Sequence, residues 1–398
     1  MRKLFGPILV AQVALVVSGT FMACTTASVS PPNADDASVD AGSIDAADGG
    51  ASPVDDLGPK LEAIRAESGL PSLAAAAYRG GVPVARGAVG TRKVGEDVPV
   101  TTADVWHLGS DTKAMTATLA AMLVDEKKLD WKSKLIDLLP DVPMDPAFAE
   151  VTLEALLYHR AGLPANPSQA WMIRAQSSTD LVSSRKDAVV ELLVSKPAQA
   201  PGTYVYSNAG YIVAGAILES IAKEPWEKMM QSRIFGKLGM TSCGFGPPAS
   251  KGQIDAPWGH SGKTGKYVPV ATGPASDNPL ALGPAGTVHC ALDDWAKFAH
   301  AHARGAKGEA GLVSAESFQK LQTPPPGGDY AMGFGVTKRD WGGGTVLTHS
   351  GSNTLFYATV WIAPEKDLVM LAATNAADDA AANAIDSAFA PMVEAYAK

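Results

Sequence analysis

Apolar residues recur at two different spacings in this chain, and the spacing changes twice along the sequence. The run "SLAAAAYRGGVPVARGAVG", beginning at residue 72, predicts two strands around a Gly-Gly turn, and "FYATVWIAP" and "LVMLAATN" near the other end are also strand-like. Between these parts, apolar residues fall three and four apart, which predicts helices packed on a core. One such stripe is Met115, Leu119, Met122 and Leu123. A chain with strands at both ends and helices between them is expected to form a sheet domain interrupted by a helical insertion.

The boundaries of this α/β fold follow from where the spacing changes. We expect the α/β part to comprise about residues 57–100 and 285–398, and the mainly helical part to comprise about residues 101–284. Together these ranges form one domain, 57–398.

Residues 1–24 have the composition of a targeting segment. "MRKLFGPILVAQVALVVSGTFMAC" has a positive start, a long apolar run and a small residue before Cys24. It resembles a bacterial lipoprotein signal, which would make Cys24 the lipidated first residue, although Phe21 and Met22 depart from the usual pattern. An uncleaved membrane anchor and an ordinary cleaved signal are the alternatives, since the run approaches the ~20 residues that span a bilayer. All three predict export, and the lipoprotein signal predicts a cell-envelope protein at the outer membrane or on the periplasmic face.

Residues 25–56 contain seven Asp, no Lys or Arg and no aromatic residue. Such a stretch cannot bury enough apolar surface to offset its ordering entropy, so we expect a disordered acidic linker. Outside it, residues 57–398 carry a net charge of only −3. This balance gives no electrostatic reason to expect nucleic-acid binding.

Two cysteines remain after Cys24, namely Cys243 and Cys290. In an oxidising compartment they could form a disulfide, and they could equally be two separate buried thiols. Their spacing does not decide between these alternatives.

The stretch "WHLGSDTKAM" places Ser110 three residues before Lys113, ahead of the apolar stripe described above. Short oxygen side chains suit a helix N-terminus, so Ser110 is expected at the start of a helix as a cap. Residues three apart on a helix share a side, so the Lys113 amine could also reach the Ser110 hydroxyl. A lone Ser-x-x-Lys is most often coincidence, and further residues are needed to support a nucleophile.

A second group of polar residues follows in "PGTYVYSNAGY". Tyr206 and Asn208 are two apart, and in an extended segment they would face one cleft together. A third group, His349 and Gly351, lies in the strand-like run "TVLTHSG".

Ser-x-x-Lys, then Tyr-x-Asn, then a basic residue with glycine two positions later is the motif order of penicilloyl serine transferases. The flanking segments "VTLEALLYHRAGLP" and "PAGTVHCALDDWAKFA" match as well. Over about residues 57–395 the chain resembles the class C β-lactamase-like serine hydrolase family, which includes β-lactamases, D-Ala-D-Ala carboxypeptidases, D-amino-acid peptidases and esterases. The resemblance implies a β-lactamase/transpeptidase-like fold: an antiparallel sheet flanked by helices, an inserted all-α domain, and an active site between them.

The resemblance also implies a role for each motif residue. Ser110 would be the nucleophile, with Lys113 or Tyr206 as the base that removes its proton. The substrate would be bound by Asn208, His349, Gly351 and Ser352. The backbone N–H groups of Ser110 and Ser352 would form the oxyanion hole. No cofactor is implied, and the remaining histidines show no metal-ligand spacing, so no metal site is expected.

We therefore expect an exported serine hydrolase that forms an acyl-enzyme on Ser110 with esters, D-amino-acid peptides or related amides. The partners expected are a small-molecule or peptidoglycan-like acyl substrate and, through the lipid anchor, a membrane. The sequence does not predict the oligomeric state. A class C-type β-lactamase and a non-catalytic penicillin-binding-like cell-wall binder are the alternatives.

His349 departs from the usual β-lactamase pattern, in which a lysine holds the carboxylate of the drug. Histidine has a reference pKa of ~6.5 and is mostly neutral at pH 7. We therefore expect weak cephalosporin hydrolysis, and activity on carboxylate-bearing substrates that rises as the pH falls toward 6.

Overall fold

A computed structural model of the chain describes residues 53–273 and 276–398. The predicted signal segment, its lipidation site Cys24 and almost all of the predicted acidic linker lie outside these residues. One end of that linker needs correction. Asp55 and Asp56 form a short strand, because their backbone pairs in parallel with Ala85 and Arg86. The folded part therefore begins before the predicted boundary at residue 57.

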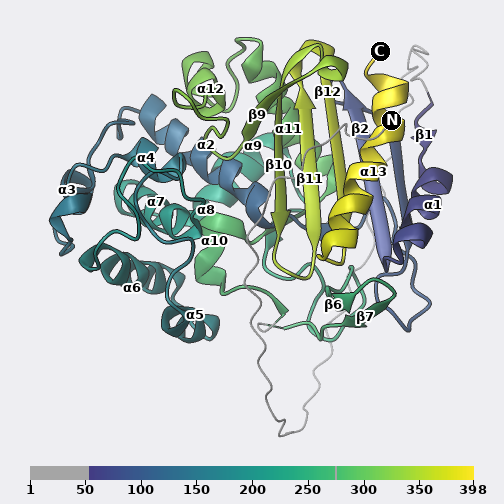
Figure 1. Ribbon diagram of the computed structural model, residues 1–398, viewed down its shortest axis with the longest axis horizontal. Coiled ribbons are helices and arrows are strands. Elements are labelled where there is room, and N and C mark those ends of the chain that lie inside the picture. Colours follow the sequence, from purple (N-terminus) through teal and green to yellow (C-terminus); the bar gives the residue numbers. More distant parts are fainter. Residues whose placement is uncertain (1–52, 274–275) are drawn as a thin grey trace, which may run out of the picture. The chain divides into compact units, whose positions relative to one another are not determined.

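A seven-stranded sheet forms one side of the fold, with the order β1-β3-β2-β12-β11-β10-β9 (Figure 1). Apart from the parallel pair β1–β3, neighbouring strands are antiparallel. The α/β fold class predicted from the sequence is confirmed. The strands are β1 (Asp55–Asp56), β2 (Ser72–Arg79), β3 (Val82–Gly90), β9 (Gly335–Arg339), β10 (Gly344–Ser352), β11 (Tyr357–Ala363) and β12 (Leu368–Thr374).

Helices cover both faces of this sheet. Helix α13 (Asp379–Tyr396) crosses in front of the strands in Figure 1 beside α1 (Gly58–Ser68), and α11 (Leu292–Ala306) packs against β2, β11 and β12. Strand β2 consequently has no exposed face, and its run Ala74–Ala77 is at most 1% exposed. Alanine suits this strand because a small side chain lets a helix lie close on each side.

The helical part lies between β3 and β9 in the sequence and packs beside the sheet (Figure 1). Its helices are α2 (Thr112–Asp125), α3 (Leu135–Leu138), α4 (Leu153–Leu157), α5 (Gln169–Gln176), α6 (Leu181–Val194), α7 (Asn208–Ala222), α8 (Trp226–Met229), α9 (Gly236–Leu238), α10 (Gly283–Gly286) and α12 (Ala315–Gln322). Short strands also occur there: β4 (Val105–His107), β5 (Gly244–Phe245), β8 (Val288–Ala291) and the hairpin of β6 (His260–Lys263) and β7 (Lys266–Pro269). Single turns of 3₁₀-helix and one π-turn, Met230–Phe235, complete it.

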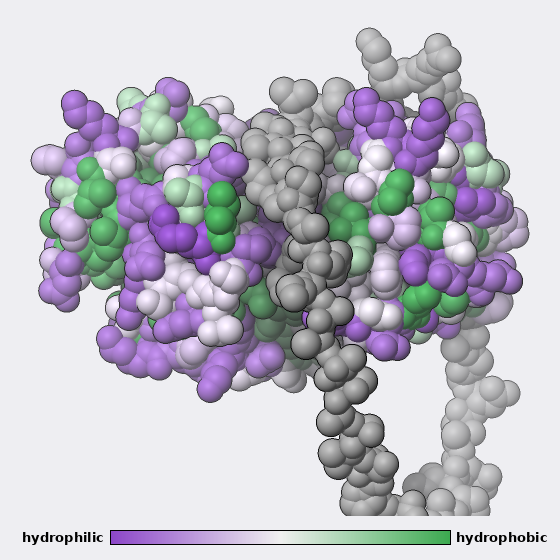
Figure 2. All heavy atoms as spheres, turned by 90° about the horizontal axis from the view of Figure 1, so that it is seen from below, coloured by the Kyte–Doolittle hydropathy of each residue, from purple (hydrophilic) through white to green (hydrophobic). Residues whose placement is uncertain are grey.

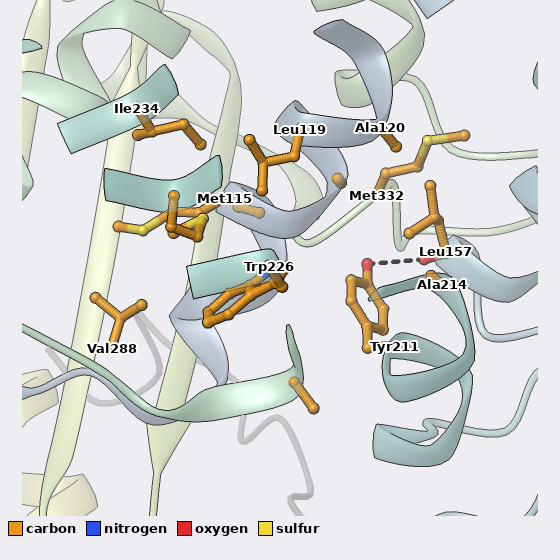
Figure 3. Packing of buried hydrophobic residues seen from close by; sticks show 14 of the residues in the cluster. Met115, Leu119, Ala120, Leu157, Tyr211, Ala214, Trp226, Ile234, Val288 and Met332 are labelled. Carbon is orange, nitrogen blue, oxygen red and sulfur yellow. Dashed lines mark hydrogen bonds between the residues drawn. The ribbon is translucent and has the colours of Figure 1, made fainter. Parts of the chain in front are cut away.

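Helix α2 is the centre of the hydrophobic core. Every residue from Thr112 to Leu123 is buried, which includes the predicted stripe and also the opposite side of the helix. Trp226 and Ile234 lie beside Met115 and Leu119, and the hydroxyl of Tyr211 on α7 donates to the carbonyl of Leu157 (Figure 3). The sequence predicted one apolar face, and the structure surrounds the whole helix, so the segment that precedes it is firmly positioned.

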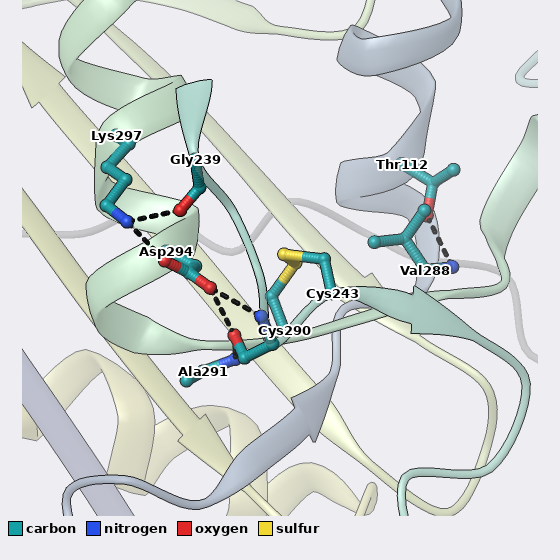
Figure 4. Close-up of a disulfide and its surroundings, with 9 residues drawn as sticks. Thr112, Gly239, Cys243, Val288, Cys290, Ala291, Asp294 and Lys297 are labelled. Atoms are coloured by element: carbon teal, nitrogen blue, oxygen red, sulfur yellow. Dashed lines mark hydrogen bonds and ion pairs between the residues drawn. A yellow bond between two sulfur atoms is a disulfide. The ribbon is translucent and has the colours of Figure 1, made fainter. Parts of the chain in front are cut away.

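A disulfide joins Cys243 and Cys290, whose Cα atoms are 4.2 Å apart (Figure 4). Of the two alternatives that the sequence allowed, a disulfide and two separate thiols, the structure has the disulfide. Cys290 belongs to β8, the middle strand of the sheet β4-β8-β5, and it pairs with Trp106 of β4. Next to the bridge, Asp294 accepts hydrogen bonds from the backbone and hydroxyl of Ser242.

On the face shown in Figure 2, apolar residues of the described part lie in small groups separated by polar ones. Isolated exposed apolar side chains are normal on proteins with an internal core. Among the residues that the structure describes, no helix has both the length and the apolar character to cross a membrane.

Candidate active site

Ser110 and Lys113 meet at the beginning of α2. Ser110 lies in the 3₁₀ turn Gly109–Asp111 that leads into the helix, and Lys113 is in the first helical turn. Lys113 Nζ is 3.0 Å from Ser110 Oγ. The predicted contact between the Lys113 amine and the Ser110 hydroxyl is therefore present.

The predicted cap at Ser110 is wrong. Helix α2 begins at Thr112, and its N-cap is Asp111, whose side chain makes no capping hydrogen bond. The Thr112 hydroxyl instead accepts from the backbone N–H of Val288 on β8, at 3.2 Å. Tertiary contacts rather than a local cap fix this helix end, and the Ser110 hydroxyl stays available to Lys113.

Lys113 has no contact with solvent, and its amine is surrounded by oxygen atoms. Besides Ser110, Nζ lies 2.7 Å from Asn208 Oδ1 and 2.7 Å from the carbonyl oxygen of Ala285. Burial lowers the pKa of Lys113 well below its usual range, while the charge of neighbouring Asp111 acts in the opposite direction. A neutral amine has two N–H groups for Asn208 and Ala285 and one lone pair for the Ser110 proton. The surroundings therefore match a proton acceptor.

Tyr206 and Asn208 reach the same place from the start of α7. The N-cap Ser207 accepts from the Gly210 N–H at 2.9 Å, so the helix begins at Asn208 and Tyr206 stands just before it. The centre of the Tyr206 ring is 4.8 Å from Lys113 Nζ. Burial raises the pKa of Tyr206, and its hydrogen bond with Ser110 opposes that rise. Tyr206 is thus a neutral phenol beside the serine.

Strand β10 brings Gly351 and Ser352 against the backbone of the segment that contains Ser110. A Cβ placed on Gly351 would lie 2.0 Å from the Leu108 carbonyl oxygen and 2.6 Å from the Ser110 nitrogen. Gly109 has φ +51°, and a Cβ there would lie 2.3 Å from the nitrogen of Ser352. Two glycines are required here because the two backbones touch with no side chain between them.

His349 is buried, and both of its ring nitrogens face protein groups. It is 6% exposed, its Nε2 is 3.1 Å from the Tyr330 hydroxyl, and its Nδ1 is 3.6 Å from Asp111 Oδ1. Burial and the charge of Lys113 lower the pKa of His349 to about 3. The predicted direct role in substrate binding does not fit a ring whose two nitrogens both face protein groups. The expected rise in activity toward pH 6 is also not supported, because the ring remains neutral there.

Several neighbours of the site carried no recognisable signal in the sequence. Asn166 accepts from Asn208 Nδ2 at 2.7 Å and so orients the amide oxygen toward Lys113. His159 packs on Tyr206 with ring centres 4.3 Å apart, and its Nδ1 accepts from the Ser207 N–H. These contacts join residues between 42 and 48 positions apart, and no local pattern indicates them. Within the described ranges 53–273 and 276–398, no group of three His, Cys, Asp or Glu residues is arranged to hold a metal ion.

Comparison with known proteins identifies one family over most of the chain. A family model described as Beta-lactamase matches residues 59–390. Penicillin-binding protein 4 of Amycolatopsis lactamdurans is 26% identical over 79% of this chain and 84% of its own length. Unguisins hydrolase ungD of Aspergillus violaceofuscus is 30% identical over 50% of this chain, but the match spans only 36% of that relative.

Among solved structures, the octameric penicillin-binding protein homologue from Pyrococcus abyssi has the same fold. It superposes with a TM-score of 0.67 over 85% of this chain and 78% of the other, at 22% sequence identity. At this identity the likeness establishes the fold alone.

Proposed function

The chain belongs to the Beta-lactamase family, and from this premise we propose that it hydrolyses esters, D-amino-acid peptides or related amides through an acyl-enzyme on Ser110. The observation that carries the proposal is the 3.0 Å contact between Ser110 Oγ and the solvent-free amine of Lys113. An alkylamine that is buried and kept neutral can take a proton from a serine hydroxyl.

The proposed acylation begins when Lys113 accepts the Ser110 proton and Oγ attacks the substrate carbonyl. The carbonyl electron pair moves to oxygen, and the N–H groups of Ser110 and Ser352 are proposed to hold this oxyanion. On collapse, the bond to the leaving group breaks, and Tyr206 donates its phenolic proton to that group. The Tyr206 oxygen then recovers a proton from Lys113, and water releases the acyl group by the same steps.

The proposed substrate carries no carboxylate beside the bond that is cleaved. His349 is buried and neutral, and the Lys113 amine is committed to Asn208, Ala285 and Ser110. Neither group offers a net positive charge to a substrate anion. Neutral esters and amides are therefore preferred over penicillins, cephalosporins and free C-terminal carboxylates.

The test of the nucleophile is covalent labelling by a fluorophosphonate, followed by mass spectrometry of the intact chain. We expect one adduct, on Ser110, that is absent in Ser110→Ala and retained in the control Ser261→Ala, which changes an exposed serine of the β6–β7 hairpin. An adduct that persists in Ser110→Ala contradicts the assignment. A wild-type protein that is never labelled supports the non-catalytic binder instead.

The substrate class is tested with a panel of short-chain nitrophenyl esters, D-Ala-D-Ala peptides with free and with amidated C-termini, and a chromogenic cephalosporin. We expect turnover of the esters or of amidated D-peptides and weak turnover of the cephalosporin. Efficient cephalosporin hydrolysis at pH 8 would make the β-lactamase alternative the better assignment.

We also propose that the protein is exported and held at the cell envelope through a lipid on Cys24. The support is the sequence of residues 1–24 alone. In a bacterial host, Cys24→Ser should move the protein to the soluble fraction or leave it unprocessed. Fractionation and cleavage identical to those of the wild type would contradict the lipid anchor.

A further inference from the structure

A buried hydrogen-bond network lies beside the catalytic cluster and shares no residue with it. Asp277, which precedes the 3₁₀ turn Leu280–Leu282, has a side chain 1% exposed. Its Oδ2 is 2.8 Å from His107 Nε2, and its Oδ1 is 2.9 Å from Asn353 Nδ2. One carboxylate thus binds two segments that are more than 240 residues apart in the sequence.

On one side, the network fixes the backbone that leads to Ser110. The Nδ1 atom of His107 accepts from the Gly109 N–H at 3.1 Å, so the ring proton must be on Nε2, where it is donated to Asp277. His107 itself is completely buried at the end of β4. Asp277 therefore sets the tautomer and orientation of a ring that holds the residue immediately before the nucleophile.

On the other side, the network fixes the turn that follows Ser352. Asn353 Oδ1 accepts from the N–H groups of Leu355 and Phe356, at 3.1 and 2.9 Å. Thr354 has a left-handed φ of +75°, a conformation that is costly for a residue with a Cβ and persists only where the surroundings enforce it. The Asn353 amide, held by Asp277, is placed to enforce it.

The two backbone N–H groups proposed for the oxyanion hole belong to Ser110 and Ser352, one residue from Gly109 and one from Asn353. We infer that Asp277 is a positioning residue that sets the spacing of these two donors through His107 and Asn353. This inference rests on the proposed function, because it assigns how the same site stabilises the oxyanion. An error in donor placement of about 1 Å can cost ~10²-fold in rate.

The test exchanges donor and acceptor between positions 277 and 353. In Asp277→Asn, the new side-chain NH2 group faces either the His107 N–H or the Asn353 NH2 group. Two donors then face each other, and one of the two hydrogen bonds is lost. In the double variant Asp277→Asn/Asn353→Asp, the new amide at position 277 can accept from His107 and donate to the new carboxylate at position 353. That carboxylate can still accept from the N–H groups of Leu355 and Phe356.

One hydrogen bond is not restored by the exchange, since the Asn278 N–H, 2.7 Å from Asp277 Oδ1, loses its acceptor. Asp378→Asn is the matched control, because Asp378 joins the β6–β7 hairpin to α13 instead.

For a nitrophenyl ester, we expect Asp277→Asn to lower kcat by 10-fold or more with KM changed less than ~2-fold. The double variant should recover most of the lost rate, and Asp378→Asn should retain the wild-type rate. The loss should be smaller for a thionoester, whose developing charge is on sulfur and uses the oxyanion donors less well. If Asp277 had only a structural role, the substitution would lower kcat equally for the ester and the thionoester.

Three results would overturn the inference: an unchanged kcat in Asp277→Asn, equal losses for ester and thionoester, or no recovery in a folded double variant. In each of these cases the wild type is still labelled by fluorophosphonate on Ser110. Absence of that label in the wild type overturns the proposed function and the inference together, so the two failures are distinguishable.

Discussion

The ionisable residues around Ser110 differ from free amino acids because nearly all of them are removed from water. Desolvation disfavours the charged form of any group, so it lowers the pKa of lysine and histidine and raises that of tyrosine. Lys113, His349 and Tyr206 shift in these directions. The shifts favour the neutral form of each group, and of the three Lys113 is the one whose amine can accept the Ser110 proton.

Lys113→Ala and Tyr206→Phe should each slow ester acylation, by the ~10²–10⁴-fold associated with lost acid–base assistance. In the wild type, kcat/KM should rise with pH as Lys113 loses its proton, and the midpoint should lie well below the ordinary lysine value of 10.5. The measurement is stopped-flow acylation across pH 5–11. A midpoint near 10.5 would contradict the neutral lysine.

His349 should contribute nothing to the pH dependence between pH 5 and 8, because its pKa is about 3. A group with a depressed pKa takes up a proton only when the pH falls through that lower value. His349→Gln keeps a polar side chain of similar reach, and its kcat/KM profile should run parallel to that of the wild type on neutral and anionic esters. A wild-type increase toward pH 6 that disappears in His349→Gln would contradict the buried, neutral ring.

At the scale of elements, the site depends on the close crossing of the segment before α2 with the end of β10. These elements are more than 240 residues apart in the sequence, and their backbones are in contact at Gly109 and Gly351. The sequence could indicate that Ser110, Tyr206 and Gly351 come together, because each motif is local and the three occur in order. It could not indicate the ring of contacts around them, since His107, Asp277 and Asn353 have no shared local pattern.

Gly351→Ala should abolish most activity, because the added Cβ would approach the Leu108 carbonyl oxygen to 2.0 Å and force the two backbones apart. Such overpacking typically costs ~1–3 kcal/mol of stability. The control is Gly311→Ala, where the nearest atom, of Phe318, is at 3.7 Å. Fluorophosphonate labelling rates and urea unfolding of both variants provide the measurement. Labelling of Gly351→Ala at the wild-type rate would show that the crossing is not required.

For helix α2, the sequence predicted the correct element and the wrong beginning. Its apolar spacing of three and four residues indicates a helix from local sequence alone, although the structure buries every side of it. The start of the helix is fixed by β8, through the Thr112–Val288 hydrogen bond, and β8 is about 176 residues away. The Cys243–Cys290 pair was undecided for the same reason, because a separation of 47 residues does not specify a distance in space.

At the scale of the whole described part, the Cys243–Cys290 disulfide is the one covalent cross-link between distant residues. It closes a loop of 47 residues, for which the chain-entropy relation gives about 4 kcal/mol of stabilisation. Cys243→Ser/Cys290→Ser should therefore lower the free energy of unfolding by ~2–4 kcal/mol in urea titrations. The wild type should show the same loss in strong reductant, and the variant should not respond to reductant. Equal stability of all forms would contradict the bridge.

The last helix of the fold meets its first strand. The hydroxyl of Tyr396 on α13 contacts the Asp55 carboxylate of β1, and Arg79 of β2 donates to the Tyr396 carbonyl. The two ends of the described domain are therefore adjacent, so the order in which the polypeptide visits its elements can be changed without moving them. Joining residue 398 to residue 54 by a short linker and opening the chain between Thr264 and Gly265 would give a permuted enzyme. The permuted chain would begin at Gly265, so its motifs would occur in the order His349, Ser110, Tyr206. The same atoms would still surround Ser110.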